Sequence, residues 1–252
     1  MRPNSVKTLW AQQQTATCGW ASCDSPLIAE AMGQAGLDAV AVDMQHGMTD
    51  LQSLPAMLTA IATTQATPMV RLASGAPHEI MKALDAGAYG LICPLVNTAK
   101  QAEDLVDAAS YPPRGGRSFG PFRARYYGGT DYLDHANDSL LTLAMIETSE
   151  GYENLDAILA VEGLDGVFVG PSDLSQNLGV TGDFFNEKCI DAIDKVSAAC
   201  AKHNIHWGAV TPSPEHAAMV VEKGCKMISP SSDAKLVNVG LQAVKSTFSQ
   251  YF

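Results

Sequence analysis

A repeated connection between helices and strands constrains the fold of this chain more than any other sequence feature. Three predicted helices end at a glycine that leads within a few residues into an apolar run, in the segments AGLDAVAV, AGAYGLIC and KGCKMIS. Glycine readily adopts the left-handed backbone that ends a helix, so each segment predicts a sharp return from a helix into a buried strand. Helices that alternate in this way with continuous apolar strands indicate an α/β protein with a parallel sheet.

The whole chain follows this alternation and contains eight strand and helix pairs. We predict strands at residues 17–22, 40–43, 68–72, 90–96, 141–146, 167–169, 206–210 and 226–229, and helices at 6–14, 25–34, 50–63, 78–86, 98–109, 155–160, 186–203, 214–223 and 233–249. Eight units predict one (β/α)8 TIM barrel that occupies residues 1–252 as a single domain. A doubly wound sheet would show fewer units, and no G-x-G-x-x-G motif follows the first strand to support dinucleotide binding.

The composition limits the kinds of function that the chain can have. With 46% hydrophobic and 17% charged residues, the chain can bury a large core. The net charge of -11 argues against a nucleic-acid partner, whose phosphates attract basic surfaces, and favours small-molecule substrates. The six cysteines form no CxxC pair, and no apolar segment reaches the roughly 18 residues of a membrane span. We therefore expect a cytoplasmic protein with reduced cysteines.

Polar side chains follow several of the predicted strands at the point where each strand ends. The run AVAVDMQHG ends in Asp43 and His46, PMVRL contains Arg71, MIET contains Glu147, and VFVGPSDLS contains Asp173. Barrel enzymes assemble their active sites at the carboxyl ends of their strands. A single histidine there is more often a strand cap, but the repetition predicts a site.

The residue types at these strand ends suggest metal-assisted proton transfer. Glu147 and Asp173 are paired carboxylates, which suit a hard divalent cation such as Mg²⁺, Mn²⁺ or Co²⁺, although either residue alone is more often a helix cap or an ion-pair partner. His46 is a candidate general base. Arg71 either stabilises developing negative charge or serves as a structural partner of an acid.

A long insertion at residues 111–137 interrupts the alternation, and we predict that it is irregular. Connections of this length are usually active-site lids or contact surfaces. The insertion contains four of the arginines of an otherwise acidic chain, Arg114, Arg117, Arg123 and Arg125. It therefore forms either a rim that attracts anions or a subunit contact, and the sequence leaves both interpretations open.

Six segments in this order resemble the metal-dependent pyruvate aldolases of the HpcH/HpaI family, in particular the hydroxy ketoacid aldolases. The segments are VDMQHG, PMVRL, LDAGAYGLICPLVNT, YPPRGGRSFGP, MIET and VFVGPSDLS, and the resemblance extends over almost the whole chain. It implies that His46 is the general base, that Arg71 stabilises an enolate, and that Glu147 and Asp173 bind the metal.

The resemblance also implies roles for residues around this centre. Asp85, in LDAGAYG, matches an acid that supports the histidine, commonly from a neighbouring subunit, and Asp43 is included among the catalytic candidates. Ser172 and Asp173 match residues whose backbone amides hold the carboxylate of the substrate, next to Gly170. These positions complete the predicted set of catalytic and substrate-binding residues.

Two residues depart from the pattern of many relatives. Gln45 stands where many have a glutamate before the histidine, and Met145 stands where many have a glutamine two residues before the metal-binding glutamate. The first departure removes a charge beside the base, and the second removes a polar contact to the oxo acid. The substrate preference of other members therefore does not transfer directly.

These observations predict an aldolase that reversibly cleaves or forms 4-hydroxy-2-oxo acids from pyruvate or hydroxypyruvate and an aldehyde, through a metal-bound enolate. A Schiff-base mechanism would require a lysine on an inward-facing strand, and Lys226 instead opens the last strand at its amino end. The alternatives are a carbon–carbon lyase of the citrate-lyase type that acts on thioesters, and a catalytically silent scaffold.

The final predicted helix, at residues 233–249, has a broad apolar face. Its own barrel could cover this face. The resemblance implies instead that partner subunits exchange the helix and that dimers assemble into a hexamer, as a trimer of dimers. Asp85 would then reach the histidine of a neighbouring subunit.

Overall fold

The computed structural model describes all 252 residues and contains a closed barrel of eight parallel strands. The strands are β1 (Ala16–Ala21), β2 (Ala39–Asp43), β3 (Thr67–Arg71), β4 (Gly90–Cys93), β5 (Leu141–Ile146), β6 (Gly166–Val169), β7 (His206–Val210) and β8 (Met227–Ser229). Each strand pairs with its neighbours in sequence, and β1 pairs with β8. The predicted TIM-barrel fold is confirmed.

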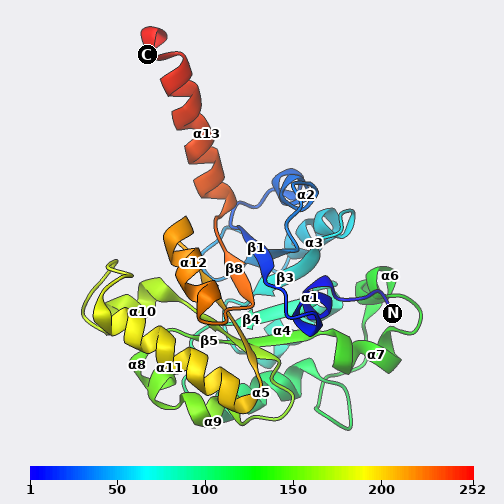
Figure 1. Ribbon diagram of the computed structural model, residues 1–252. Coiled ribbons are helices and arrows are strands. Elements are labelled where there is room, and N and C mark those ends of the chain that lie inside the picture. The colour runs from blue at the N-terminus through cyan, green and yellow to red at the C-terminus, as the bar shows by residue number, and fades with distance from the viewer.

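Thirteen α-helices accompany the barrel, and most of them lie on its outside (Figure 1). They are α1 (Ser5–Ala11), α2 (Pro26–Gln34), α3 (Leu54–Ala62), α4 (Pro77–Asp85), α5 (Ala99–Ala109), α6 (Phe122–Gly128), α7 (Tyr132–Ser139), α8 (Ser149–Glu153), α9 (Leu155–Leu159), α10 (Pro171–Asn177), α11 (Glu187–His203), α12 (Pro214–Glu222) and α13 (Asp233–Thr247), followed by a 3₁₀ turn, Ser249–Tyr251. Five of these helices have proline in their first two positions, where its missing N–H costs no hydrogen bond.

The glycines that predicted the fold have the expected backbone conformation. Gly36, Gly87 and Gly224 adopt φ angles of 93°, 103° and 92° between a helix and the strand that follows it. Gly163, with a φ of 90°, leads into β6 in the same way. This fourth connection was not predicted from the sequence, and it follows the same pattern.

Two separate apolar clusters stabilise the barrel. The larger one lies between the strands and the surrounding helices. The smaller one fills the barrel interior, where Trp20 packs edge to face on Phe168 at a centroid distance of 5.7 Å. Val6 and Trp10 of α1 belong to this interior cluster, and the Trp10 indole donates a 2.7 Å hydrogen bond to the carbonyl oxygen of Lys226. Helix α1 therefore closes the end of the barrel at which the strands begin, called here the amino end.

The insertion at residues 111–137 differs from the prediction in two ways. It contains helix α6 and most of helix α7, so it is not irregular. It also connects a helix, α5, to the start of a strand, β5, and so lies at the amino end rather than at the carboxyl end where active sites form. In Figure 1, α6 and α7 lie near the N label, whereas α8 and α10 lie on the opposite side.

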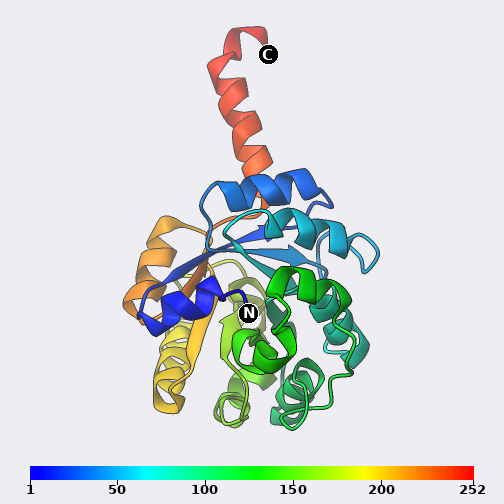
Figure 2. The same ribbon diagram turned by 90° about the vertical axis from the view of Figure 1, so that its right-hand side faces the viewer.

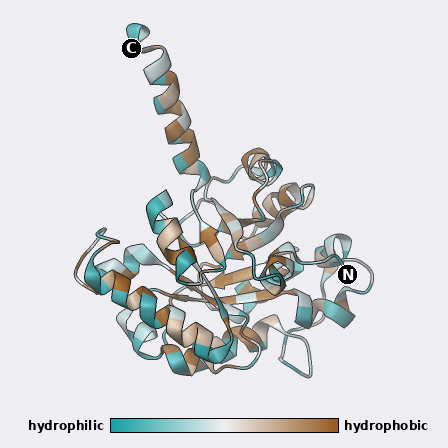
Figure 3. Cartoon of the chain, viewed as in Figure 1, coloured by the Kyte–Doolittle hydropathy of each residue, from teal (hydrophilic) through white to brown (hydrophobic).

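Helix α13 projects away from the barrel (Figures 1 and 2). Only its first residue is buried: the Asp233 carboxylate accepts hydrogen bonds from the amides of Ser22 and Cys23, at 2.9 and 2.8 Å. Every later residue is exposed, including a set of large apolar side chains, Leu236, Val237, Val239, Leu241, Val244 and Phe248. Figure 3 shows brown apolar segments along the whole helix. Its own barrel does not cover the apolar face.

The composition predicts reduced cysteines and no membrane span. All six cysteines are free, and five of them are buried. None of the helices combines the length and the apolarity needed to cross a membrane.

Candidate active site at the carboxyl end of the barrel

Asp43 and Arg71 form the base of the candidate site. The two residues are paired in register at the ends of β2 and β3. Arg71 donates from Nε to Asp43 Oδ1 at 2.9 Å and from Nη2 to Oδ2 at 2.6 Å. Burial tends to raise the pKa of the Asp43 carboxyl, but Arg71 and the backbone amides of His46 and Gln45 outweigh it, so the pKa is lowered. These contacts thus favour the charged form of Asp43, and both of its carboxylate oxygens are already engaged.

Trp20 supports Arg71 from below and was not among the predicted site residues. The Arg71 guanidinium carbon lies 4.7 Å from the centroid of the Trp20 ring, a cation–π contact. This contact and the Asp43 pair fix the guanidinium in one orientation. Arg71 has five N–H groups, and the pair with Asp43 uses two of them. Arg71 is therefore a structural partner of an acid, one of its two predicted roles. Its other N–H groups are available to a ligand.

His46 lies in the turn that follows β2. Its backbone amide donates to Asp43 Oδ1 at 3.2 Å, which ties the turn to the Asp43–Arg71 pair. The side chain is exposed, and its ring makes no hydrogen bond within the chain. The imidazole is thus held by its backbone and is free to meet a substrate or a group from another molecule.

Glu147 is buried at the end of β5, and its two carboxylate oxygens make different contacts. Oε1 accepts a 2.9 Å hydrogen bond from the Leu95 amide. Oε2 lies against Gly170, where an added Cβ would be only 2.6 Å away. A side chain at position 170 would press on the Glu147 carboxylate, which adds a steric role to the predicted substrate-binding role of Gly170.

Several other predicted site residues affect the pKa of Glu147. Burial raises the pKa of Glu147, and the nearby Asp173 carboxylate raises it further. The Leu95 amide, Arg71 and His46 act in the opposite direction, but the net pKa stays above its ordinary value. Four of the predicted residues therefore act on a common space at the carboxyl end of the barrel.

Asp173 and Ser172 lie in the first turn of α10, and both are exposed. The first amides of a helix have no acceptor within the helix, so they are available to an anionic group. No cluster of three or more His, Cys, Asp or Glu side chains is gathered for a metal. The chain would thus offer two carboxylates, Glu147 and Asp173, with water and substrate oxygens completing the coordination, as is common for Mg²⁺.

Asp85 lies at the other end of the barrel from His46. Its Oδ1 accepts a 2.8 Å hydrogen bond from Nη2 of Arg117, whose side chain is fully buried. Arg117 also lies over the Tyr111 ring, at 4.4 Å, and donates to the Tyr132 hydroxyl. Within one chain, Asp85 and His46 are not brought together.

The arginines of the insertion mostly serve the fold. Arg114 pairs with Asp138, Arg117 with Asp85, and Arg123 donates to the carbonyl oxygen of Ala86. Only Arg125 is exposed without an internal partner. Of the two interpretations left open for the insertion, an anion-attracting rim is the less favoured for these three arginines, because each is bonded within the chain.

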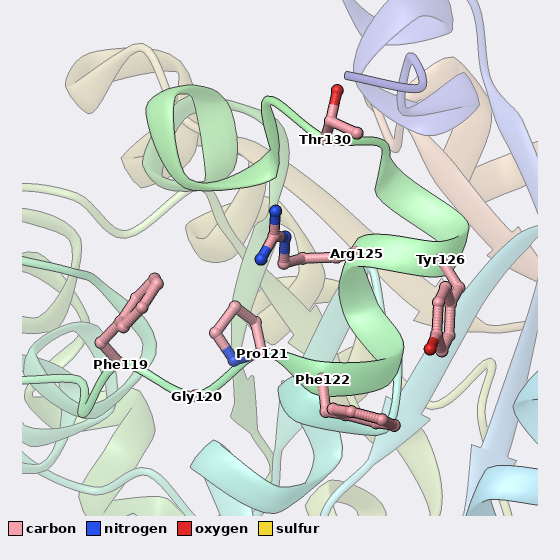
Figure 4. A pocket seen from close by; sticks show the side chains of 7 residues that line it. All are labelled: Phe119, Gly120, Pro121, Phe122, Arg125, Tyr126 and Thr130. Carbon is pink, nitrogen blue, oxygen red and sulfur yellow. The ribbon is translucent and has the colours of Figure 1, made fainter.

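Arg125 instead lines a hollow of about 390 Å³ at the amino end (Figure 4). Phe119, Phe122 and Tyr126 surround it, and their side chains are 64%, 78% and 78% exposed. Such a group of exposed aromatic residues is typical of a surface that contacts another protein.

Comparison with known proteins agrees with this geometry. The model of the HpcH/HpaI aldolase/citrate lyase family matches residues 17–239. The chain belongs to this family. It is 47% identical, over 176 residues and 70% of both chains, to the hydroxypyruvate/pyruvate aldolase of Rhizorhabdus wittichii. It is 32% identical over 248 residues to the 5-keto-4-deoxy-D-glucarate aldolase of Salmonella arizonae, covering 98% of this chain and 97% of that protein.

A solved structure of a family member has the same fold as this chain. The HpcH/HpaI aldolase/citrate lyase family protein from Burkholderia cenocepacia superposes with a TM-score of 0.89 at 30% identity, over 97% of this chain and 99% of that one. Because the family and its named relatives are aldolases and lyases, the chain is a carbon–carbon lyase of the aldolase type.

The two departures from the family pattern lie directly beside the site. Gln45 is partly buried next to His46, and its Oε1 has no hydrogen-bond partner. Met145 faces the barrel interior below Glu147, and its Cε would lie 2.8 Å from a Cβ at Gly170. Both residues therefore contribute uncharged side chains next to the candidate site.

Proposed function

We propose that this protein is a divalent-metal-dependent aldolase that joins pyruvate or hydroxypyruvate to an aldehyde and cleaves the resulting 4-hydroxy-2-oxo acid. The observation that supports the proposal most is that His46, Arg71, Glu147 and Asp173 all stand at or just after the carboxyl ends of barrel strands. The names of the two aldolase relatives support the same reaction class.

The donor set of Glu147 and Asp173 fits a hard cation. Both are carboxylates, one buried and one exposed, and the negative charge of Asp173 adds to burial in raising the pKa of Glu147. A bound Mg²⁺, Mn²⁺ or Co²⁺ would relieve this repulsion and would make the C–H next to a coordinated carbonyl more acidic.

The other residues have roles that follow from their surroundings. The exposed imidazole of His46 would take the proton from the carbon next to the carbonyl. The free N–H groups of Arg71 would meet the negative charge that then develops on oxygen, since its orientation is fixed before the substrate binds. The amides of Ser172 and Asp173 would hold the carboxylate of the oxo acid, and Gly170 leaves room for Glu147.

A Schiff-base mechanism finds no support. No lysine is buried in the structure, and Lys226 donates to the carbonyl oxygen of Gln13 at the amino end. A lysine that forms an imine needs a desolvated position within reach of the substrate.

The decisive experiment is a turnover assay with added Mg²⁺, Mn²⁺ or Co²⁺, in which pyruvate and hydroxypyruvate are tested against several aldehydes. We expect cleavage and synthesis that stop in chelator, and that are lost in Glu147→Ala and Asp173→Ala. Full activity of both variants in chelator would contradict the metal assignment. A citrate-type thioester assay run in parallel tests the lyase alternative, and absence of all turnover would favour a silent scaffold.

We also propose that the active site is completed across a subunit boundary in a homo-oligomer, a hexamer built from dimers. Three features support this: the uncovered apolar face of α13, the exposed aromatic hollow at the amino end, and the unpartnered ring of His46. Asp85 lies at the amino end with 30% of its side chain exposed, so a neighbouring subunit could receive its free oxygen.

Mixed oligomers test this assembly. Inactive His46→Ala chains mixed with inactive Asp85→Ala chains should regain part of the activity, because some shared sites receive both intact groups. The matched control combines His46→Ala with Glu147→Ala, two residues of the same chain's site, and no site in that mixture would gain an intact His46–Glu147 set. A fully active monomer in light scattering, or no recovery in the first mixture, would refute the proposal.

A further inference from the structure

Asp233 is a buried carboxylate at the start of α13. It is the first residue of the helix, and only 1% of it is exposed. Its carboxylate accepts from the amides of Ser22 and Cys23, at 2.9 and 2.8 Å, and from the amide of Ala234 at 2.7 Å. All three donors are backbone groups. Asp233 therefore fixes the backbone that follows β1, because a charged acceptor makes strong hydrogen bonds with amides.

Ser22 joins this carboxylate to the turn that contains His46. The Ser22 carbonyl oxygen accepts a 2.8 Å hydrogen bond from the amide of Met48, two residues after His46. Gly47 packs on the same segment, since a Cβ at Gly47 would lie only 2.9 Å from the Ser22 carbonyl oxygen. The turn thus rests on backbone atoms whose own position depends on Asp233.

Asp43 and Ser22 hold opposite ends of this turn. The amides of Gln45 and His46 donate to Asp43 Oδ1 at 3.1 and 3.2 Å, which holds its beginning, and the Ser22 carbonyl oxygen holds its end. The Ser22 hydroxyl also donates to Asp43 Oδ2, but the distance of 3.5 Å is long for such a bond. The backbone carbonyl of Ser22 is therefore the stronger of its two links to the site.

We propose that Asp233 is a positioning residue for His46, and that it acts through the backbone of Ser22 and the turn at residues 44–48. This inference rests on the proposed function, in which His46 takes a proton from the substrate. A base must lie within hydrogen-bond reach of that proton, and a small displacement is costly. Loss of the contact that holds one end of the turn should therefore slow proton transfer, although Asp233 itself takes no part in the chemistry.

Asp38 provides a matched control at the other end of β1. Its Oδ2 accepts from the amide and the hydroxyl of Thr17, both at 2.8 Å, at the amino end of the strand. Asp233→Ala and Asp38→Ala each remove a carboxylate that holds β1, so both should lower Tm. In the metal-loaded enzyme, Asp233→Ala should lower kcat for exchange of the pyruvate methyl protons with solvent by roughly tenfold at unchanged KM. Asp38→Ala should leave both values unchanged.

Hydrogen–deuterium exchange of the backbone amides measures the same link without substrate or metal. The Met48 amide should exchange roughly tenfold faster in Asp233→Ala than in the unmodified protein, and at the unmodified rate in Asp38→Ala. Ser22→Ala removes only the hydroxyl and keeps the carbonyl oxygen, so it should change neither the Met48 amide nor kcat. If Asp233→Ala does not fold, Asp233→Asn keeps one acceptor oxygen and should show both effects to a smaller extent.

Three outcomes would overturn this inference and leave the proposed function intact. The first is an equal fall in kcat in Asp233→Ala and Asp38→Ala, because the loss would then follow stability alone. The second is unchanged exchange of the Met48 amide in the Asp233 variants, and the third is a Ser22→Ala variant as slow as Asp233→Ala. Absence of metal-dependent proton exchange and turnover in the unmodified enzyme would instead overturn the proposed function, and the role of His46 with it.

Discussion

The two ends of the barrel differ in how some of their charged side chains are used. At the amino end, charges neutralise each other inside the chain, as in Arg117 with Asp85 and Lys7 with Asp165, at 2.8 and 2.7 Å. At the carboxyl end, Arg71 and Asp43 are also paired, but the His46 ring and the Asp173 carboxylate are exposed without a partner. Polar groups with satisfied bonds stabilise a fold, whereas groups with unused bonding capacity are available for a ligand. The difference supports the proposal that the active site lies at the carboxyl end.

The largest expected effect is at Glu147. Glu147→Gln keeps the size of the side chain and an oxygen for the Leu95 amide, but it removes the charge that a cation needs. We expect metal-dependent turnover to fall by roughly 10³-fold with little change in Tm. Glu150→Gln, an exposed neighbour on α8, is the control and should stay active. Equal loss of turnover in both variants would mean that turnover depends on negative charge near α8 and not on Glu147 as a metal ligand.

His46→Ala should lower kcat by roughly 10²- to 10⁴-fold, the usual contribution of a general base. His135→Ala changes the same residue type at the amino end, where the side chain is 57% exposed, and should have no effect on kcat. If pyruvate proton exchange continues unchanged in His46→Ala, another group is the base. The proposed difference in function between His46 and His135 would then be wrong.

Asp85 tests the contrast between the two ends of the barrel, because it lies at the amino end and is proposed to act in the active site of a neighbouring subunit. Asp85→Asn leaves the fully buried Arg117 without its counter-charge, and we expect unfolding to become easier by about 2 kcal/mol. Denaturant titration measures this cost. Arg117→Met should show a loss of stability of the same sign. If Arg117→Met keeps activity and Asp85→Asn loses it under folded conditions, then Asp85 has a role beyond stability.

The smallest expected effect comes from His216, a buried polar side chain that lies near α10 at the carboxyl end. Both ring nitrogens lack partners, and Phe184 and Phe185 pack on the ring. Burial lowers the pKa of His216, so the unfolded chain takes up a proton more readily than the folded one. Stability should therefore fall as the pH drops below the ordinary histidine pKa of about 6.5, and it should not change above it.

Thermal unfolding between pH 8 and pH 5 tests this dependence. His216→Leu should flatten it in part only, because burial and Lys226 also lower the pKa of His206. A pH profile that is identical in His216→Leu and in the unmodified protein would show that His216 is protonated equally in both states.

The sequence predicted the barrel and the residues at its carboxyl end for a physical reason. Each strand is a continuous apolar run, and each polar side chain that follows it must lie at the same edge of a parallel sheet. Trp20 was missed because it is one apolar residue within an apolar strand. Nothing in the sequence shows that this ring faces inward, below Arg71.

Other features depended on contacts that a linear pattern does not contain. The left-handed backbone of Leu95, with a φ angle of 54°, has no sequence signal, because leucine is among the residues that avoid it. Helices α6 and α7 lie in a segment rich in glycine, arginine and aromatic residues, without a clear apolar period. The partners of Arg117 come from α4 and from both sides of the insertion, so its structural role was visible only in three dimensions.

The closure of the barrel by β1 and β8 has a consequence for synthesis of the protein on the ribosome. The partners Ala16 and Met227 are separated by more than 200 residues. At a translation rate of roughly 5–20 residues per second, β1 waits about 10–40 s for its last neighbour. During that time one edge of the sheet, and the interior that Trp10 helps to fill, stay open to other nascent chains. The growing chain is therefore most vulnerable to aggregation just before its final strand emerges.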